Sequence, residues 1–270
     1  MTLPLLIEAS ELNQHINDPK LLIIDLSSEE NYQKGHIPGA IHLAPSALLL
    51  GQPPIPNKLP SEEQLQKLCS EIGLTEDKHV VVYDDQKGPW AGRLIWTLNI
   101  IGHHNCSFLN GQLQSWVEAN FPLEKTINKA VNAHYPIDLN TQLVADVEFI
   151  TAHLKDPNVQ IWDARSQAEY TGEKVINANK GGHIPSAQHM EWTDCLIADD
   201  NPRIKPADEL LSLLTEKGIT PDKTIITHCQ THRRSGLTYL VARYLGFTDI
   251  RCYDGSWFEW GNLADTPVEK

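Results

Sequence analysis

The residues best suited to chemistry lie in one short stretch, THCQTHRRSG, at 227–236. Cys229 stands there with two histidines and two arginines close by in the chain. The apolar run TIIT precedes this stretch, and SGLTYLVARYLG follows it with the character of a helix, so the spacing predicts a strand-to-helix turn. Ligands of open α/β sheets bind at the carboxyl ends of parallel strands. Cys229 is therefore the candidate nucleophile.

The surroundings predicted for Cys229 favour its thiolate form. The amides at the start of the following helix carry partial positive charge, and Arg233 or Arg234 adds a full charge if its side chain turns inward. Such influences lower a thiol pKa from about 8.5 into the range of about 3.5–7.5. The thiolate is the nucleophile, and successive N–H groups of a tight loop can hold a thiolate, a persulfide or an oxyanion. An arginine would add a two-pronged contact to a sulfur or phosphorus oxyanion.

Other readings of the same loop stay open. A single cysteine at a strand end is commonly a small buried apolar residue, although the polar neighbours here count against that. A metal site made by His228, Cys229 and His232 would be confined to one short loop without a ligand pair elsewhere. We expect His228 and His232 to pack the loop or line its rim.

Composition narrows the class of partner. The chain has 270 residues with a net charge of −13, and its pI is about 5.3. This acidity argues against nucleic acid and anionic membranes, so a small anionic substrate would need a local basic site. The five cysteines form no CxxC pair, and no segment resembles a signal peptide or a membrane span. We expect reduced thiols and a cytoplasmic protein.

The chain repeats itself. The segment 21–43 resembles 159–190, with Asp25 matching Asp163 and with GHIP in both copies. A repeat this long indicates a duplicated domain. Asp25 and Asp163 are 138 residues apart and the two GHIP motifs 147, so the second copy gains nine residues within TGEKVINANKGG. This insertion predicts a surface loop, either at a binding face or functionally neutral.

Strand and helix signals alternate in both copies. The apolar runs LLIID, HVVVYD and NCSFLN read as strands of the first copy, and VQIWD, TIITH and DIRCYD as strands of the second. Helical patterns between them include SEEQLQKLCSEIG, WAGRLIWTLNIIG and PADELLSLLTEKG. This order predicts an α/β fold in which each domain is a mainly parallel sheet flanked by helices. We place the domains at 1–124 and 146–270, joined by a linker at 125–145.

The two copies differ at the position of the nucleophile. In YDDQKGPWAG we align Asp85 with Cys229, so the first copy has no thiol there and is expected to be non-catalytic. Asp163 and Arg165 end the VQIWD strand of the second copy near the candidate site. We expect them to support the loop as an ion pair, with direct substrate contact as the alternative.

These motifs resemble the tandem-domain rhodanese (sulfurtransferase) family. YQKGHIPGAIHL at 32–43 is similar to its N-terminal signature and YDGSWFEW at 253–260 to its C-terminal one, and the family also has Asp at the cysteine position of an inactive first domain. The loop looks like that of a bacterial subgroup, Cys-Gln-Thr-His-x-Arg-Ser. In one departure, Glu169 stands where vertebrate members carry a substrate-binding arginine.

The resemblance implies transfer of sulfur from thiosulfate, through a Cys229 persulfide, to cyanide, a small thiol or a protein thiol. It implies no metal or organic cofactor. The loop residues would bind the anionic donor and the persulfide; these are Gln230, Thr231, His232, Arg233, Arg234 and Ser235. Mercaptopyruvate as the donor and a persulfide carrier protein remain alternatives. A dual-specificity phosphatase is a third, although its loop is Cys-x5-Arg and this one is Cys-x4-Arg.

Overall fold

The structure, a computed structural model, describes residues 2–270 and divides into two compact units. Of the described residues, the first unit comprises 2–50, 59–140 and 200–203, and the second comprises 51–58, 141–199 and 204–270. Residues 121–140 contain no helix or regular strand. The domain boundaries drawn from the sequence stay predictions.

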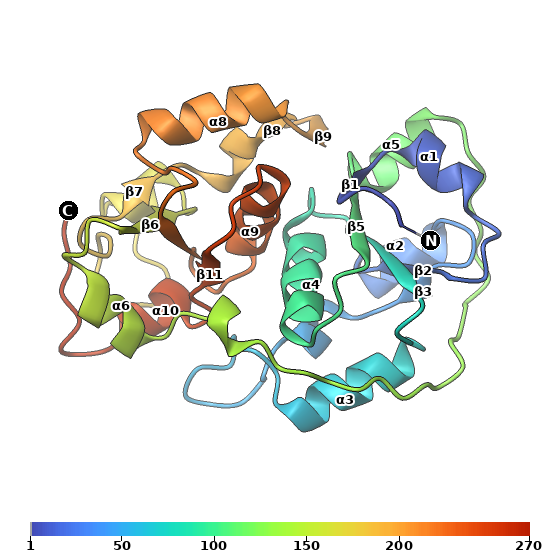
Figure 1. Ribbon diagram of the computed structural model, residues 1–270, viewed down its shortest axis with the longest axis horizontal. Helices are drawn as coiled ribbons and strands as arrows, with labels where there is room; N and C mark the ends of the chain where they lie inside the picture. Colours follow the sequence, from blue (N-terminus) through green and yellow to red (C-terminus); the bar gives the residue numbers. More distant parts are fainter. Residues whose placement is uncertain (1) are drawn as a thin grey trace. The chain divides into compact units, whose positions relative to one another are not determined.

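The first unit is built on a parallel five-stranded sheet in the order β1-β5-β4-β2-β3 (Figure 1). Its elements in chain order are β1 (Leu6–Ile7), α1 (Ala9–Gln14), β2 (Leu21–Asp25), α2 (Glu29–Lys34), β3 (Ile41–His42), the 3-10 turn η1 (Pro45–Leu48), α3 (Glu62–Glu71), β4 (His79–Tyr83), α4 (Pro89–Ile100), β5 (Cys106–Leu109) and α5 (Gln112–Glu118).

The second unit has a parallel four-stranded sheet in the order β11-β10-β6-β7. Its elements are η2 (Thr141–Leu143), α6 (Val147–His153), β6 (Val159–Asp163), α7 (Gln167–Tyr170), β7 (Gln188–His189), η3 (Trp192–Cys195), α8 (Ala207–Glu216), β10 (Thr224–His228), α9 (Arg234–Tyr244), β11 (Ile250–Cys252) and α10 (Ser256–Trp260). Two short strands between η3 and α8 pair separately, β8 (Leu196–Ala198) and β9 (Asn201–Ile204). The predicted parallel α/β arrangement is confirmed.

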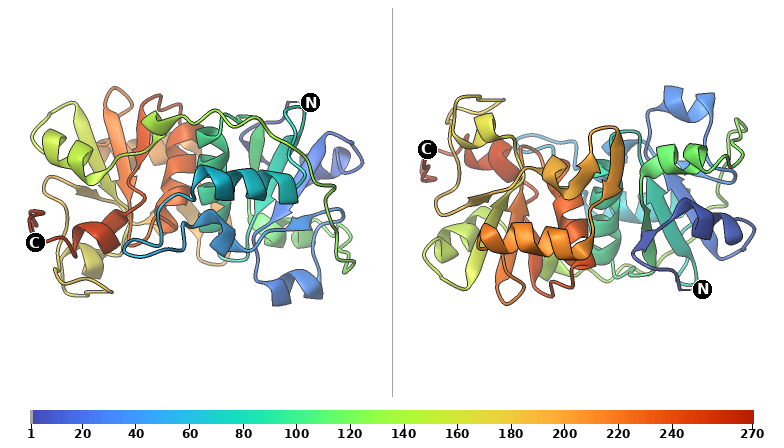
Figure 2. Two further views of the ribbon diagram at one scale, coloured as in Figure 1. Left: turned by 90° about the horizontal axis from the view of Figure 1, so that it is seen from below. Right: turned by 90° about the horizontal axis from the view of Figure 1, so that it is seen from above.

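Helices cover both faces of each sheet because the central strands are apolar on both sides. In the first unit, Ile23 and Val81 pack with Leu12 of α1 and Trp116 of α5 in one core cluster, while α4 lies on the other face (Figures 1 and 2). Val80 and Val82 of β4 point to the face opposite to that of Val81, because side chains alternate along a strand. All three are buried, as expected for the continuous apolar run HVVVY.

The second core is assembled in the same way. Ile161 of β6 and Ile226 of β10 pack with Ile150 of α6 and with Trp257 and Trp260 of α10. Both tryptophans are buried, and the indole N–H of Trp260 donates to the Pro267 carbonyl at 2.8 Å. The core therefore fixes α10, whose first residues lie against the candidate loop.

Local signals explain where several elements begin and turn. Ser61 and Gln64 form a reciprocal capping box at the start of α3. The second GHIP motif needs its glycine, because Gly182 has a φ of +119° and a Cβ there would lie 2.1 Å from the Glu269 carbonyl oxygen. The backbone of His183 pairs with that of Glu269 and so ties this turn to the chain end.

A feature that the sequence does not reveal is the assignment of 51–58 to the second unit. The Asn57 side-chain amide donates to the carbonyls of Asp254 at 2.6 Å and Gly255 at 3.2 Å, and Lys58 Nζ lies 2.9 Å from Glu259. This segment therefore braces the turn that leads into α10.

Candidate functional site

Cys229 is the first residue after β10, and α9 begins five residues later. β10 lies between β6 and β11, and the side chain of Cys229 is buried, with 1% exposed. Its amide donates to Ser256 Oγ at 3.4 Å, and its carbonyl accepts the Trp257 amide at 3.0 Å. The turn between β10 and α9 is thus held by the amino end of α10.

Hydrogen-bond donors and one cation surround the Cys229 sulfur. Ser235 Oγ lies 3.5 Å from Sγ, and the backbone amides of Ser235 and Thr231 also hydrogen-bond it. Burial by itself would raise the pKa of Cys229, but the Arg234 charge and these hydrogen bonds outweigh it and hold the pKa below its ordinary value. In Cys69, where only burial acts strongly, the pKa rises to about 12.

Arg234 is shared between the cysteine and an acid. Its guanidinium hydrogen-bonds the Cys229 sulfur and also donates from Nη1 and Nη2 to the two carboxylate oxygens of Glu169, at 2.7 and 2.8 Å. Glu169 is buried, and Ser166 Oγ donates to its Oε2 at 2.8 Å. Burial opposes the charge of Glu169, but Arg234 and Ser166 lower its pKa, so the pair is ionic at neutral pH.

The remaining loop residues take different positions around Cys229. Gln230 is buried and donates from Nε2 to the Ile176 carbonyl at 2.5 Å. His232 is buried with a positive φ of 56°, and its Nδ1 lies 2.8 Å from Ser235 Oγ. Thr231 and Arg233 are half-buried, and Arg233 is the N-cap of α9. The loop therefore brings together every predicted site residue of 229–235.

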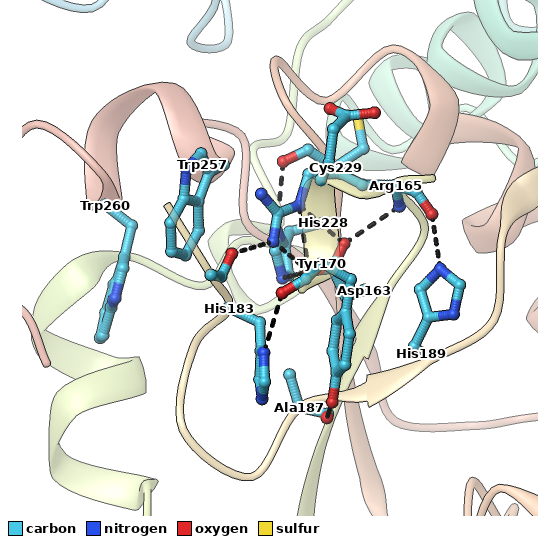
Figure 3. A network of polar contacts seen from close by, with 12 residues as sticks. Asp163, Arg165, Tyr170, His183, Ala187, His189, His228, Cys229, Trp257 and Trp260 are labelled. Atoms are coloured by element: carbon cyan, nitrogen blue, oxygen red, sulfur yellow. Dashed lines mark hydrogen bonds and ion pairs between the residues drawn. The ribbon is translucent and has the colours of Figure 1, made fainter. Parts of the chain in front are cut away.

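A buried polar network lies beneath the cysteine (Figure 3). Arg165 makes an ion pair with Asp163 at 2.6 Å, donates to the Gly182 carbonyl at 2.8 Å, and stacks on Trp257 with its Cζ 4.2 Å from the ring centre. Burial alone would raise the pKa of Asp163, but His228 and the Arg165 guanidinium lower it to about 2. Both Asp163 and Arg165 are at most 1% exposed, so this ion pair lies within the fold and has little access to a substrate.

His228 lies within this network. Its Nε2 is 3.5 Å from Asp163 Oδ2, and its Nδ1 is 3.2 Å from the Cys229 carbonyl oxygen. Complete burial lowers the pKa of His228, although Asp163 acts in the opposite sense, so the ring is neutral at pH 7. The expected role in loop packing agrees with this position.

The nine-residue insertion adjoins the cysteine loop. Besides the Ile176 contact of Gln230, the amides of Asn179 and Lys180 donate to the Gly261 carbonyl, at 3.1 and 3.0 Å. Residues 171–182 form no helix or strand, but these bonds fix them beside α10. The insertion is therefore held against the cysteine loop and α10, and its role in binding stays a prediction.

The alignment of the two copies needs one correction. Asp25 pairs with Tyr83, and Asp163 pairs in the same register with His228. Asp84 follows Tyr83 at the end of β4, and Cys229 follows His228 at the end of β10. Asp84 and not Asp85 therefore occupies the cysteine position. The sequence supports the same register, because an ungapped alignment of TEDK at 75–78 with TPDK at 220–223 also places Asp84 opposite Cys229.

Asp84 fills the loop of the first unit with its own carboxylate. Oδ1 accepts the amides of Gln86 and Gly88, at 2.7 and 2.8 Å, and Oδ2 accepts those of Trp90 and Ala91, at 2.8 and 3.1 Å. These amides form a cradle of the kind that binds an anion, but the anion in it is the Asp84 carboxylate of the loop itself. Asp85 instead accepts hydrogen bonds from Ser28 and Asn31 at the start of α2.

Two contacts of the site were not predicted from the sequence. The partnership of Glu169 with Arg234 joins positions 65 residues apart, and its one signal was an acid where an arginine was expected. Ser256, with a φ of 54°, supplies the oxygen that holds the Cys229 amide, and the motif YDGSW gave no indication of that contact.

Among residues 2–270, no group of three His, Cys, Asp or Glu side chains is arranged to hold a metal ion. Within the same part of the chain, no helix is long and apolar enough to cross a membrane.

Comparison with known proteins adds to this geometry. The model of the rhodanese-like domain matches residues 8–119 and again residues 146–263. A thiosulfate sulfurtransferase of Azotobacter vinelandii is 44% identical over 268 residues, which span 99% of this chain and 98% of that protein. The sulfur carrier protein TtuD of Thermus thermophilus is 31% identical over 278 residues, 98% of this chain and 96% of that protein.

A solved structure is similar over the same length. SseA from Escherichia coli, a 3-mercaptopyruvate sulfotransferase with the rhodanese fold, superimposes with a TM-score of 0.85 at 29% identity. The match covers 94% of this chain and 99% of SseA. The resemblance predicted from the motifs is confirmed, as is the fold of two such domains.

Proposed function

The chain belongs to the rhodanese-like family, and from that premise we propose that it is a thiosulfate sulfurtransferase that carries sulfur on Cys229. The observation that supports this most strongly is the surrounding of the Cys229 sulfur, where Ser235, backbone amides and Arg234 all favour an anion. A buried cysteine without these donors would hold its proton, as Cys69 does.

In the first half-reaction, the Cys229 thiolate attacks the outer sulfur of thiosulfate. A bond forms between the two sulfurs while the bond from the outer sulfur to the sulfonate sulfur breaks, and sulfite leaves with that electron pair. The product is a Cys229 persulfide, whose terminal sulfur carries the negative charge. The Ser235 hydroxyl and the amides of the turn stabilise this anion because they already point into the cradle.

In the second half-reaction, an acceptor attacks the terminal sulfur. Cyanide forms a carbon–sulfur bond, the persulfide bond breaks, and thiocyanate leaves the Cys229 thiolate behind. A small thiol or a protein thiol accepts the sulfur in the same way once it is ionised. The thiolate is regenerated without a redox cofactor, because the electron pair of the broken bond returns to Cys229.

The two arginines of the loop have different roles. Arg234 stabilises the cysteine thiolate while Glu169 compensates its charge. Arg233, the half-buried N-cap of α9, lies at the helix end that already attracts anions. We therefore assign the larger part of donor affinity to Arg233, and Arg233→Ala should raise the KM for thiosulfate with a smaller effect on the acceptor step.

A sulfur carrier role is a second candidate, and the identity with a sulfur carrier protein over the whole chain supports it. The two roles differ in turnover. A carrier loads one sulfur rapidly, holds it, and releases it to a particular protein partner, whereas an enzyme turns over with small acceptors.

Thiocyanate formation from thiosulfate and cyanide tests the proposal. Cys229→Ser should reduce turnover about a thousandfold or more, because it removes the nucleophile. Cys195→Ser is the matched control, since that buried thiol lies outside the loop and should leave turnover unchanged. Mercaptopyruvate and an aryl phosphate serve as competing substrates. Faster turnover with mercaptopyruvate than with thiosulfate would identify mercaptopyruvate as the preferred donor. Release of phosphate that depends on Cys229 would contradict the proposal of sulfur transfer.

A further inference from the structure

Three side chains of the loop form a short chain of polar contacts that ends on the nucleophile. His232 Nδ1 lies 2.8 Å from Ser235 Oγ, and Ser235 Oγ lies 3.5 Å from Cys229 Sγ. His232 and Ser235 are fully buried, and Cys229 is 1% exposed. Bulk water therefore does not compete for the hydrogen bonds between these three side chains, and each bond keeps one direction.

Counting hydrogens fixes the direction when Cys229 is a thiolate. The Ser235 hydroxyl has one hydrogen, and a thiolate can only accept. If this hydrogen points at Sγ, the Ser235 oxygen has only lone pairs to offer His232, so His232 Nδ1 must carry a hydrogen. With the opposite tautomer, Nδ1 would accept the hydroxyl hydrogen, and the oxygen lone pairs of Ser235 would face the negative sulfur.

We propose that His232 is a positioning residue that donates its Nδ1 hydrogen to Ser235 and thereby turns the Ser235 hydroxyl toward the Cys229 sulfur. The hydroxyl then stabilises the thiolate of the free protein. It stabilises the persulfide anion in the same way, a part of the inference that rests on the proposed function. His232 acts through Ser235 and needs no contact with the sulfur donor.

The backbone of the loop makes a sharp test possible. His232 has a φ of 56°, a conformation that asparagine and aspartate adopt more readily than other non-glycine residues. His232→Asn places an amide N–H donor near the position of Nδ1, whereas His232→Asp places only acceptors there. The two replacements have nearly the same shape and differ in the direction in which they orient Ser235.

Other charged or titratable groups that influence Cys229 stay unchanged in both variants. In the second unit Arg234 on α9 acts on Cys229 directly. Glu169 on α7 and Glu191 before η3 act on Arg234, and the buried Asp163, Arg165 and His228 act on one another. His232→Asp also adds a negative charge that His232→Asn does not. A second pair of variants, which carries Ser235→Ala as well, measures the effect of this charge on the pKa of Cys229 without the Ser235 hydroxyl.

The measurement is the pH dependence of Cys229 alkylation by iodoacetamide, with no sulfur donor present. We expect His232→Asn to keep the wild-type thiol pKa within about half a unit. His232→Asp should raise it by about one unit or more, a tenfold or larger fall in the thiolate-to-thiol ratio. When Ser235→Ala is added to both variants, the difference between Asn and Asp should shrink to less than half.

An Asn–Asp difference that stays the same after Ser235→Ala would overturn the inference, because charge alone would then explain it. An Asn variant that shifts the pKa as far as the Asp variant would also overturn it. If a variant does not fold, the ¹⁵N shifts of His232 in the wild-type protein decide the matter, since an unprotonated Nδ1 contradicts the proposal. None of these readings requires sulfur transfer, so they fail or succeed independently of the proposed function.

Discussion

Glu169 and Arg234 form a two-pronged ion pair beside the Cys229 thiol, with N–O distances of 2.7 and 2.8 Å. The pair makes the loop less positive than the letters THRRSG indicate, because one of its two arginines is compensated by a buried acid. The carboxylate also closes the capping box of α7 with Ser166, so its position is fixed before any substrate arrives.

Removing the charge of Glu169 should strengthen the binding of an anionic donor. In Glu169→Gln, Arg234 keeps a hydrogen-bond acceptor but loses its counter-charge. At several ångströms, one charge in a partly screened site changes the binding of a dianion by about 1–2 kcal/mol. We therefore expect the KM for thiosulfate to fall about five- to thirtyfold, with a steeper dependence on salt, measured by steady-state kinetics at two ionic strengths.

Glu216→Gln on the exposed face of α8 is the control for that change, since it alters the net charge of the chain equally. It should leave the KM unchanged. If Glu169→Gln raises the KM instead, Glu169 holds Arg234 in the position that binds the donor.

The cysteines should differ in reactivity although all five are buried. The pKa of Cys229 is lowered despite burial, whereas burial raises that of Cys69 to about 12 and that of Cys195 further. Brief treatment of the native protein with iodoacetamide at pH 7 should therefore label Cys229 first, as peptide mapping would show. Labelling that begins at Cys69 or Cys195 would contradict the lowered pKa of Cys229.

The carboxylate of Asp84 should be a major support of the first unit. Asp84→Ala leaves four backbone amides without their acceptor, two of them at the buried residues Gly88 and Ala91, and we expect the free energy of unfolding to fall by roughly 3 kcal/mol or more. Asp85→Ala is the matched control and should cost about 1 kcal/mol, because that exposed residue bonds only the start of α2. Urea unfolding measures both, and a larger loss in Asp85→Ala would contradict the assignment of the cradle to Asp84.

The stability of the first unit should depend on pH through His79. Burial lowers the pKa of His79 to about 4, while an unfolded histidine binds its proton near pH 6.5. The unfolded chain then binds more protons between these values, so the free energy of unfolding falls as the pH drops from about 6.5 toward 4. Between pH 7 and pH 5 the contribution of this residue is about 2 kcal/mol.

His79→Gln provides the test, because glutamine does not titrate and can still donate to Ser107. The Nε2 of His79 lies 2.7 Å from Ser107 Oγ and is the donor there, since Ser107 gives its own hydrogen to the Pro4 carbonyl. The loss of stability between pH 7 and pH 5 should be about 2 kcal/mol smaller in this variant. A variant with the full wild-type loss would assign the acid sensitivity to other buried histidines.

The sequence predicts the parts of this protein that depend on local pattern. Continuous apolar runs such as HVVVY gave the buried parallel strands, and the turn after TIITH gave the position of Cys229. The contacts that tune the cysteine come from distant segments, because Glu169 lies 65 residues before Arg234 and Ser256 lies 27 residues after Cys229. No spacing rule links such positions. The confusion of Asp84 with Asp85 has a different cause, since the ungapped match of TEDK at 75–78 to TPDK at 220–223 already aligns Asp84 with Cys229 and the double aspartate hid a shift of one residue.

Sulfur transfer by this chain requires a persulfide at Cys229, and intact-protein mass spectrometry tests for that persulfide most directly. Reduced protein is weighed before and after thiosulfate, beside Cys229→Ala and with Cys195→Ser as a control. We predict that the wild type and Cys195→Ser gain the mass of one sulfur atom, that Cys229→Ala gains none, and that cyanide removes the added mass. A wild type that gains no sulfur, or a Cys229→Ala variant that gains one, would contradict sulfur transfer through Cys229.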